Sequence, residues 1–169
     1  MGVNFYFASR KGGRVVDGWN WPGKNWSGVG YSSFNLARAR IATFFNPRFG
    51  LVLSLLNVKN GMAAEDRDML CHVDRFLPPM VCEFICQPDC EGVLTRRQCT
   101  AFVREVEGKD FHAKVEPCTV SWTQTWMSPP AVKTEDNGWM DHDEFVRSTD
   151  YLVGGIREAS RRGCAFAWS

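Results

Sequence analysis

The stretch FICQPDCEGVLTRRQC, residues 84–99, contains three cysteines that are close enough in the sequence to bind one metal ion. Thiolates bind structural zinc, and such sites usually pair a tight Cys-x2–4-Cys knuckle with a second ligand pair about 12 to 20 residues further on. Cys86 and Cys90 have the spacing of a first knuckle, but no separate second knuckle follows. A zinc site would therefore combine Cys86, Cys90 and Cys99 with a residue from another segment, such as His72.

These cysteines have two simpler interpretations. The total of seven is odd and no secretory signal opens the chain, which argues against the disulfide framework of a secreted domain. A single disulfide bond between Cys90 and Cys99 is a further alternative. A free cysteine ordinarily packs as a small buried hydrophobic residue. We therefore expect buried thiols and no cofactor, with zinc as the alternative.

Tryptophans near basic residues form a second group that could contact a partner. Three of them lie within residues 19–26, beside glycines and cations, and three more lie within residues 122–139. Aromatic rings interleaved with cations stack bases or sugars, aromatic side chains are enriched at protein interfaces, and large rings also fill cores beneath loops. The predicted partner-binding residues are Trp19, Trp21, Trp26, Arg38, Arg40, Trp122, Trp126 and Trp139.

Motifs that would name a reaction are missing from the sequence. The chain has no Gly-x-Ser-x-Gly turn, no phosphate-binding loop and no Gly-x-Gly-x-x-Gly fingerprint. His142 lies in the acid-rich stretch Asp141–Glu144, but these acids also suit the first turn of a helix. The pattern favours a protein that is not an enzyme, and a metal-dependent enzyme using the central cysteines is the alternative.

The elements that position these residues begin and end with strand patterns. Val3, Phe5 and Phe7 alternate with polar neighbours, and a glycine-rich turn leads from them into residues 13–21, which predicts an antiparallel hairpin. Residues 164–169 alternate in the same way and predict a third strand.

Helix signals occupy the middle of the chain. Ser32 or Ser33 can cap a helix that begins at Phe34, and Asn46-Pro47 would end it. Residues 62–77 begin with helix formers and early acids, as a helix N-terminus does. Residues 51–57 are too short to assign as helix or strand, and residues 81–86 are interpreted as a strand that leads into the cysteine turn.

Two capping boxes predict the remaining helices. Thr95 with Gln98 begins one, and Asp141 with Glu144 begins the last, which ends at Gly163. Within the last helix, Gly154-Gly155 indicates close packing against another backbone or a kink.

These signals predict one α+β domain over residues 1–169. A small antiparallel sheet, made of the N-terminal hairpin and the C-terminal strand, would be covered by about four helices. Residues 109–139 are rich in Trp, Pro and Thr and would form an irregular excursion with a short strand near residues 114–122.

Charge is unevenly distributed along the chain. Residues 1–50 contain seven Lys or Arg and one acid, a net +6, while the remainder contains 13 basic and 18 acidic residues, a net −5. Opposite halves of this kind usually attract each other within one domain, although a basic face for nucleic acid is a second possibility. No apolar run approaches the roughly 20 residues that span a bilayer, so we expect a cytoplasmic protein and no membrane partner.

Several short motifs resemble those of short actinobacterial and actinophage proteins with no assigned activity. The resemblance covers both ends of the chain and residues 84–107, and Gln87 stands where those proteins tend to have a histidine. The motifs are Met1-Gly2-Val3, Gly13-Arg14 with Gly18-Trp19, Tyr31-Ser32-Ser33-Phe34, Asp89-Cys90-Glu91-Gly92-Val93-Leu94-Thr95 with Cys99, and Ala159 and Gly163 with Phe166.

The resemblance implies a phage or actinobacterial setting and, if the chain is phage-encoded, a location in the host cytosol. Together with the missing catalytic motifs, it predicts a non-enzymatic accessory factor that binds a host or viral protein, for instance as an inhibitor of host defence. The alternatives are a zinc-stabilised or metal-dependent enzyme, and a nucleic-acid binder that uses the basic N-terminal third.

Overall fold

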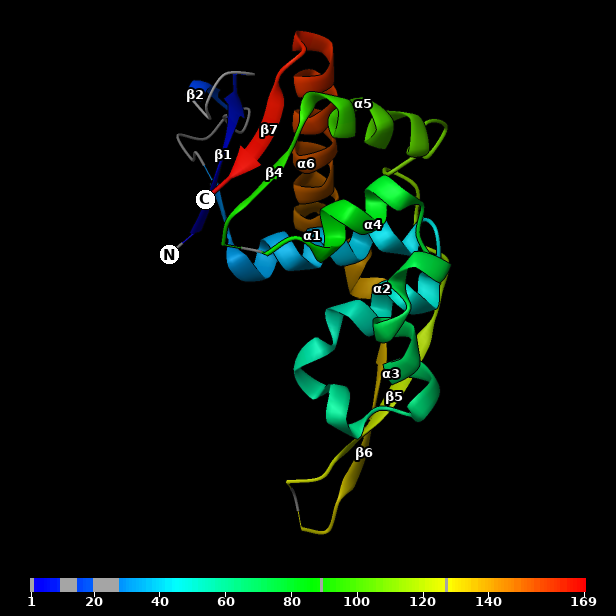
Figure 1. Ribbon diagram of the computed structural model, residues 1–169. Helices are drawn as coiled ribbons and strands as arrows, with labels where there is room; N and C mark the ends of the chain where they lie inside the picture. Colours follow the sequence, from blue (N-terminus) through cyan, green and yellow to red (C-terminus); the bar gives the residue numbers. More distant parts are fainter. Residues whose placement is uncertain (1, 10–14, 20–27, 89, 127) are drawn as a thin grey trace.

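The computed structural model describes residues 2–9, 15–19, 28–88, 90–126 and 128–169 (Figure 1). Its central feature is a five-stranded antiparallel sheet with the strand order β2–β1–β7–β4, in which β3 pairs with the first half of β1. The strands are β1 (Gly2–Ala8), β2 (Val15–Gly18), β3 (Gly28–Gly30), β4 (Gly92–Leu94) and β7 (Ala165–Trp168).

The α+β class, the N-terminal hairpin and the C-terminal strand predicted from the sequence are confirmed. Helices α1, α4, α5 and α6 lie against the sheet, with α6 running along it, while α2 and α3 lie beyond α1 (Figure 1). The helices are α1 (Tyr31–Thr43), α2 (Pro47–Ser54), α3 (Ala64–Cys71), α4 (Pro79–Cys86), α5 (Arg96–Glu105) and α6 (Asp143–Arg162), with 3-10 turns η1 (Leu56–Gly61), η2 (Val73–Arg75) and η3 (Gly138–Asp141).

The core is built from aromatic side chains on one face of this sheet. Phe5 lies opposite Trp168 in the β1–β7 ladder, and Phe7 lies opposite Phe166. All four are buried, and the rings of Phe5 and Phe166 stack with centroids 5.6 Å apart. The period of two predicted for both strands therefore places these four rings on the side that α6 covers.

The predicted start of the first helix is wrong, and its predicted stop has a second role. Helix α1 already begins at Tyr31, so that Ser32 and Ser33 lie inside its first turn. Helix α1 ends at Thr43, just before Asn46-Pro47 as predicted, and Asn46 also caps α2, since its Oδ1 accepts a hydrogen bond from the Phe49 backbone N–H at 2.9 Å. Pro47 then takes the first helical position, where its missing N–H needs no partner.

The two short apolar runs are both helical. Residues 51–57 continue α2 into η1, and residues 81–86 belong to α4 rather than to a strand. The predicted helix over residues 62–77 is shorter, because α3 ends at Cys71 and η2 follows.

Of the two predicted capping boxes, the one at Thr95 is present and the one at Asp141 is not. Thr95 and Gln98 form the reciprocal pair of hydrogen bonds that starts α5. Asp141 does not cap α6, because its Oδ1 accepts from the Val115 N–H at 3.0 Å and His142 is the N-cap residue. Its carboxylate therefore orders the preceding excursion instead of the helix.

The excursion over residues 109–139 is more regular than expected. It contains a second sheet, the antiparallel hairpin of β5 (Thr119–Gln124) and β6 (Ala131–Asp136). This hairpin extends away from the main sheet, beyond α2 and α3 (Figure 1). No helix in the described part of the chain is both long and apolar enough to cross a bilayer.

The paired glycines of α6 allow a test of the packing between α6 and the sheet. A Cβ at Gly155 would lie 2.6 Å from Cε2 of Phe166 and 2.9 Å from Nε1 of Trp19, whereas a Cβ at Gly154 would lie 3.6 Å from Cζ2 of Trp19. Close packing is thus confirmed at Gly155, although the neighbours are ring atoms and not backbone. We expect Gly155→Ala to lower the free energy of unfolding by about 1 to 3 kcal/mol, because packed rings must shift.

Gly154→Ala is the matched control. It should raise the free energy of unfolding by up to about 1 kcal/mol, because the helix gains alanine's propensity without a clash. Urea denaturation measures the free energy of unfolding of both variants. Equal values would show that α6 does not pack closely against Phe166 and Trp19 at Gly155.

Candidate functional site

Arg40, predicted to face a partner, is instead fully buried on α1. Its Nε donates to the Met140 carbonyl at 2.7 Å, its Nη1 to the Phe111 carbonyl at 2.7 Å and its Nη2 to the Ala113 carbonyl at 3.3 Å. Burial lowers the pKa of this guanidinium, while the charges of Asp141 and Asp150 act in the opposite direction. An arginine held by three carbonyls in the interior is a structural residue, so its predicted contact with a partner is corrected.

Arg38 is buried as well, two residues earlier on α1. Its Nη1 donates to the Gln87 carbonyl at 2.8 Å, and its guanidinium carbon lies 4.0 Å from the ring centroid of Phe34 and 5.4 Å from that of Trp168. The charge is thus paired with a loop carbonyl and with aromatic faces, where a cation is favourable. Both side chains are therefore largely enclosed by protein atoms.

The predicted tryptophans divide into separate groups. Trp19 packs against Phe7 and Tyr151, and its Nε1 donates to the Tyr151 carbonyl at 2.9 Å. Trp139 is half-buried and meets the ring of Phe145 at 5.0 Å. Both support the core, and neither is an exposed contact. Trp21 and Trp26 lie outside the described residues.

The candidate zinc ligands do not come together. Cys99 is buried on α5, where its thiol donates to the Leu94 carbonyl at 3.4 Å and desolvation raises its pKa to about 11. Cys86 and Cys90 are exposed, and His72 lies beside Asp68. Among the described residues, no three His, Cys, Asp or Glu side chains form a set that could hold a metal ion.

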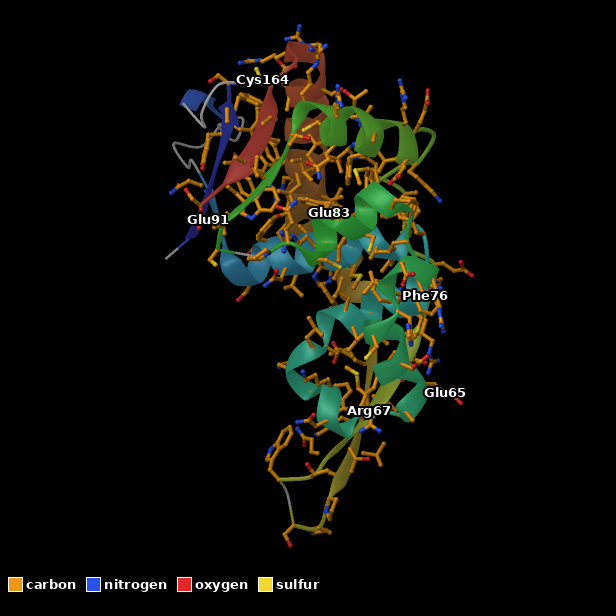
Figure 2. The ribbon with its side chains drawn as sticks, in the orientation of Figure 1. Glu65, Arg67, Phe76, Glu83, Glu91 and Cys164 are labelled. Atoms are coloured by element: carbon orange, nitrogen blue, oxygen red, sulfur yellow. The ribbon has the colours of Figure 1, made fainter. Side chains whose placement is uncertain are left out.

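The prediction of buried thiols holds only for Cys99. All seven cysteines are free, so Cys90 and Cys99 form no disulfide bond, and Cys71, Cys86 and Cys90 are exposed. Figure 2 shows how far the thiols are scattered, since Cys164 and Glu91, the neighbour of Cys90, lie at opposite ends of the sheet.

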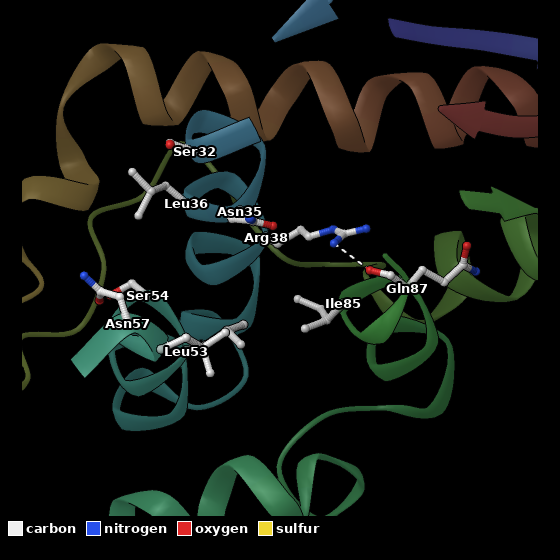
Figure 3. A pocket seen from close by; sticks show the side chains of 10 residues that line it. Ser32, Asn35, Leu36, Arg38, Leu53, Ser54, Asn57, Ile85 and Gln87 are labelled. Carbon is white, nitrogen blue, oxygen red and sulfur yellow. Dashed lines mark hydrogen bonds between the residues drawn. The ribbon is translucent and has the colours of Figure 1, made fainter. Parts of the chain in front are cut away.

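A groove of about 540 Å³ lies between α1, the α2–η1 segment and the end of α4 (Figure 3). Leu36, Leu53 and Ile85 supply apolar surface, and Ser54 and Asn57 supply polar groups. Arg38 closes one end, where its hydrogen bond to the Gln87 carbonyl is visible. Apart from the guanidinium of Arg38, the polar side chains that line it are the hydroxyl and amide groups of Ser32, Asn35, Ser54, Asn57 and Gln87.

The large apolar side chains with the highest exposed fractions lie elsewhere, on the β5–β6 hairpin. Trp126, in the turn, is 68% exposed, and Val132, on β6, is 72% exposed. Trp122, on β5, is half-buried, and its Nε1 is buried without a hydrogen-bond partner in the described structure. Of the described tryptophans predicted as contacts, Trp126 is therefore the one that is freely accessible.

Gln87 is a residue whose role the sequence did not reveal. Its side-chain Oε1 accepts from the Val93 N–H at 2.8 Å and its Nε2 donates to the Val93 carbonyl at 3.0 Å. The amide thus pairs with the edge strand β4 as a neighbouring strand would, which protects an edge prone to association. Only the three-dimensional approach of the α4–β4 loop to that edge could identify this role.

Comparison of the chain with protein-family models, with curated proteins and with solved structures finds no match in any of the three. The site must therefore be interpreted from its own geometry.

The buried position of Arg40 leads to a stability prediction. Arg40→Met should lower the free energy of unfolding by about 3 kcal/mol or more, because three buried carbonyls lose their donor at about 1 kcal/mol or more each. The control is Arg97→Met on the exposed face of α5, which should change stability by less than about 0.5 kcal/mol. Urea denaturation measures both, and a loss below about 1 kcal/mol for Arg40→Met would contradict the buried network.

Proposed function

We propose that this protein is a non-enzymatic interaction module that binds another protein through its β5–β6 hairpin. The observation that carries the proposal is the exposure of Trp126 and Val132 on one projecting hairpin. Exposed tryptophan is enriched among the residues that dominate protein interfaces, and exposed apolar surface on a protruding element is a typical contact.

The base of the hairpin is fixed, so a partner would meet a preformed surface. Val120 is buried with Leu51, Val52 and Met62. Asn137, at the end of β6, accepts from the Cys118 N–H at 2.9 Å and donates to the Glu116 carbonyl at 2.8 Å. A rigid element loses less conformational entropy on binding than a flexible loop.

One edge of the hairpin is open to strand addition. The outer edge of β5 is covered, because a Cβ at Gly61 would lie 2.1 Å from the Thr123 carbonyl oxygen and Met62 bridges to Trp122. In the described structure no strand pairs with the outer edge of β6. An extended segment of a partner could add there by backbone hydrogen bonds, with Val132 and Trp126 as side-chain contacts.

No observation on the described residues favours the nucleic-acid alternative, and the candidate zinc ligands do not come together. Arg38 and Arg40 are enclosed, Arg48 forms a bidentate pair with the buried carboxylate of Asp66, and the other four basic residues of the first 50 lie outside the described residues. The phage-type accessory role and the inhibition of host defence stay predictions that depend on the sequence resemblance alone.

The test compares partner capture by matched variants of the full chain. Immobilised wild-type protein is expected to retain one stoichiometric protein from a bacterial lysate. Trp126→Ala should weaken that complex by about 30-fold, the effect of removing a hot-spot side chain, and Val132→Thr should weaken it by a smaller factor. Val93→Thr is the control, since Val93 is 46% exposed on β4, on the other sheet.

Two results would contradict the proposal. Capture that survives both hairpin substitutions but is lost on Val93→Thr would move the contact to the main sheet. Capture of no stoichiometric protein by the wild type would argue against an interaction module altogether. Both hairpin variants should keep wild-type stability within about 0.5 kcal/mol, because the side chains are exposed.

A further inference from the structure

Cys82, which lies outside the predicted zinc set, and Cys86, which belongs to it, lie together on one face of α4. Cys82 and Cys86 are four residues apart in the helix, and their Sγ atoms are 4.0 Å apart. Cys82 is half-buried and Cys86 is exposed, so the pair can be reached from solvent through Cys86.

The geometry of a helix distinguishes between two uses of this pair. A disulfide needs Cβ atoms about 3.5 to 4.5 Å apart, whereas residues four apart on a helix have Cβ atoms about 5 to 6 Å apart. A direct bond would therefore distort the last turn of α4. Two metal–sulfur bonds of about 2.3 Å, however, span the observed 4.0 Å at an angle of about 120° with the helix unchanged.

We propose that Cys82 and Cys86 form a two-thiolate chelating site for a soft cation of low coordination number, of which Cu(I) is the type. Soft thiolate ligands select such ions, and the exposed side of Cys86 leaves room for a further ligand.

The surroundings of the pair agree with a cation and not with an anion. Desolvation, the neighbouring Cys86 and, to a smaller extent, the charges of Asp74 and Glu83 raise the pKa of Cys82 to about 11. The same negative charges that disfavour a lone thiolate attract a bound cation. Binding would release both thiol protons, so the affinity should rise with pH.

Phenylarsine oxide is the geometric probe for such a pair. Trivalent arsenic forms two As–S bonds, the As=O bond breaks, and the oxygen leaves as water with both thiol protons, so no oxidant is required. Reduced full-length protein with one equivalent of the probe should show, by intact mass spectrometry, one phenylarsenic group per chain. It should also lose two thiols that a chromogenic thiol reagent can titrate.

Single substitutions identify the ligands. Cys82→Ser and Cys86→Ser should each weaken probe binding by about 100-fold, because the second bond is no longer intramolecular. Cys71→Ser is the control, since Cys71 is exposed on a different helix, and it should leave binding unchanged. In competition with a chromogenic Cu(I) chelator, the same two variants should lose Cu(I) by a similar factor.

Three results would overturn the proposal. Loss of probe binding on Cys90→Ser but not on Cys82→Ser would assign the pair to Cys86 and Cys90. Cu(I) affinity unaffected by either substitution on α4 would exclude the cation. Ready formation of a Cys82–Cys86 disulfide by one equivalent of hydrogen peroxide would show that the helix does not hold the two sulfurs apart.

Discussion

The buried guanidinium of Arg40 is the interaction on which the arrangement of this chain depends. A planar cation with five donors can remain in an interior only if carbonyls surround it, and here the carbonyls come from Phe111, Ala113 and Met140. These residues lie 71 to 100 positions away in the sequence. The segment before β5 and the segment after β6 must therefore both return to α1, and that requirement fixes the base of the hairpin.

Arg38 also connects α1 to distant segments of the chain. Its contacts with the Gln87 carbonyl and with the rings of Phe34 and Trp168 join the end of α4 to the main sheet. The indole N–H of Trp168 donates to the Pro88 carbonyl at 3.0 Å, and the side chain of Gln87 covers the β4 edge. One short loop thus contacts Arg38, Trp168 and the open sheet edge together.

These buried contacts explain why the two arginines of α1 and most of the aromatic residues do not serve as the exposed partner contacts that the sequence predicted. The guanidinium groups of Arg38 and Arg40 bind carbonyls of distant segments. Most of the large described rings fill the core between α6 and the sheet. The two most exposed large apolar side chains, Trp126 and Val132, lie on the hairpin, whose base Asn137 and Val120 hold in place. The proposed binding role depends on this fixed base and its apolar tip.

Local features were determined by the sequence itself: the alternation of Val3, Phe5 and Phe7, the Thr95–Gln98 capping box and the Gly163 stop of α6 each depend on residues a few positions apart. The candidate site could not be predicted in this way. The burial of Arg38 and Arg40, the separation of Cys86 from Cys99 and the exposure of Trp126 depend on which distant segments pack together. The run at residues 81–86 shows the same limit, since a short apolar stretch suits a buried helix as well as a strand. Only tertiary packing decides such cases, because the free energy that selects them comes from contacts between residues far apart in the chain.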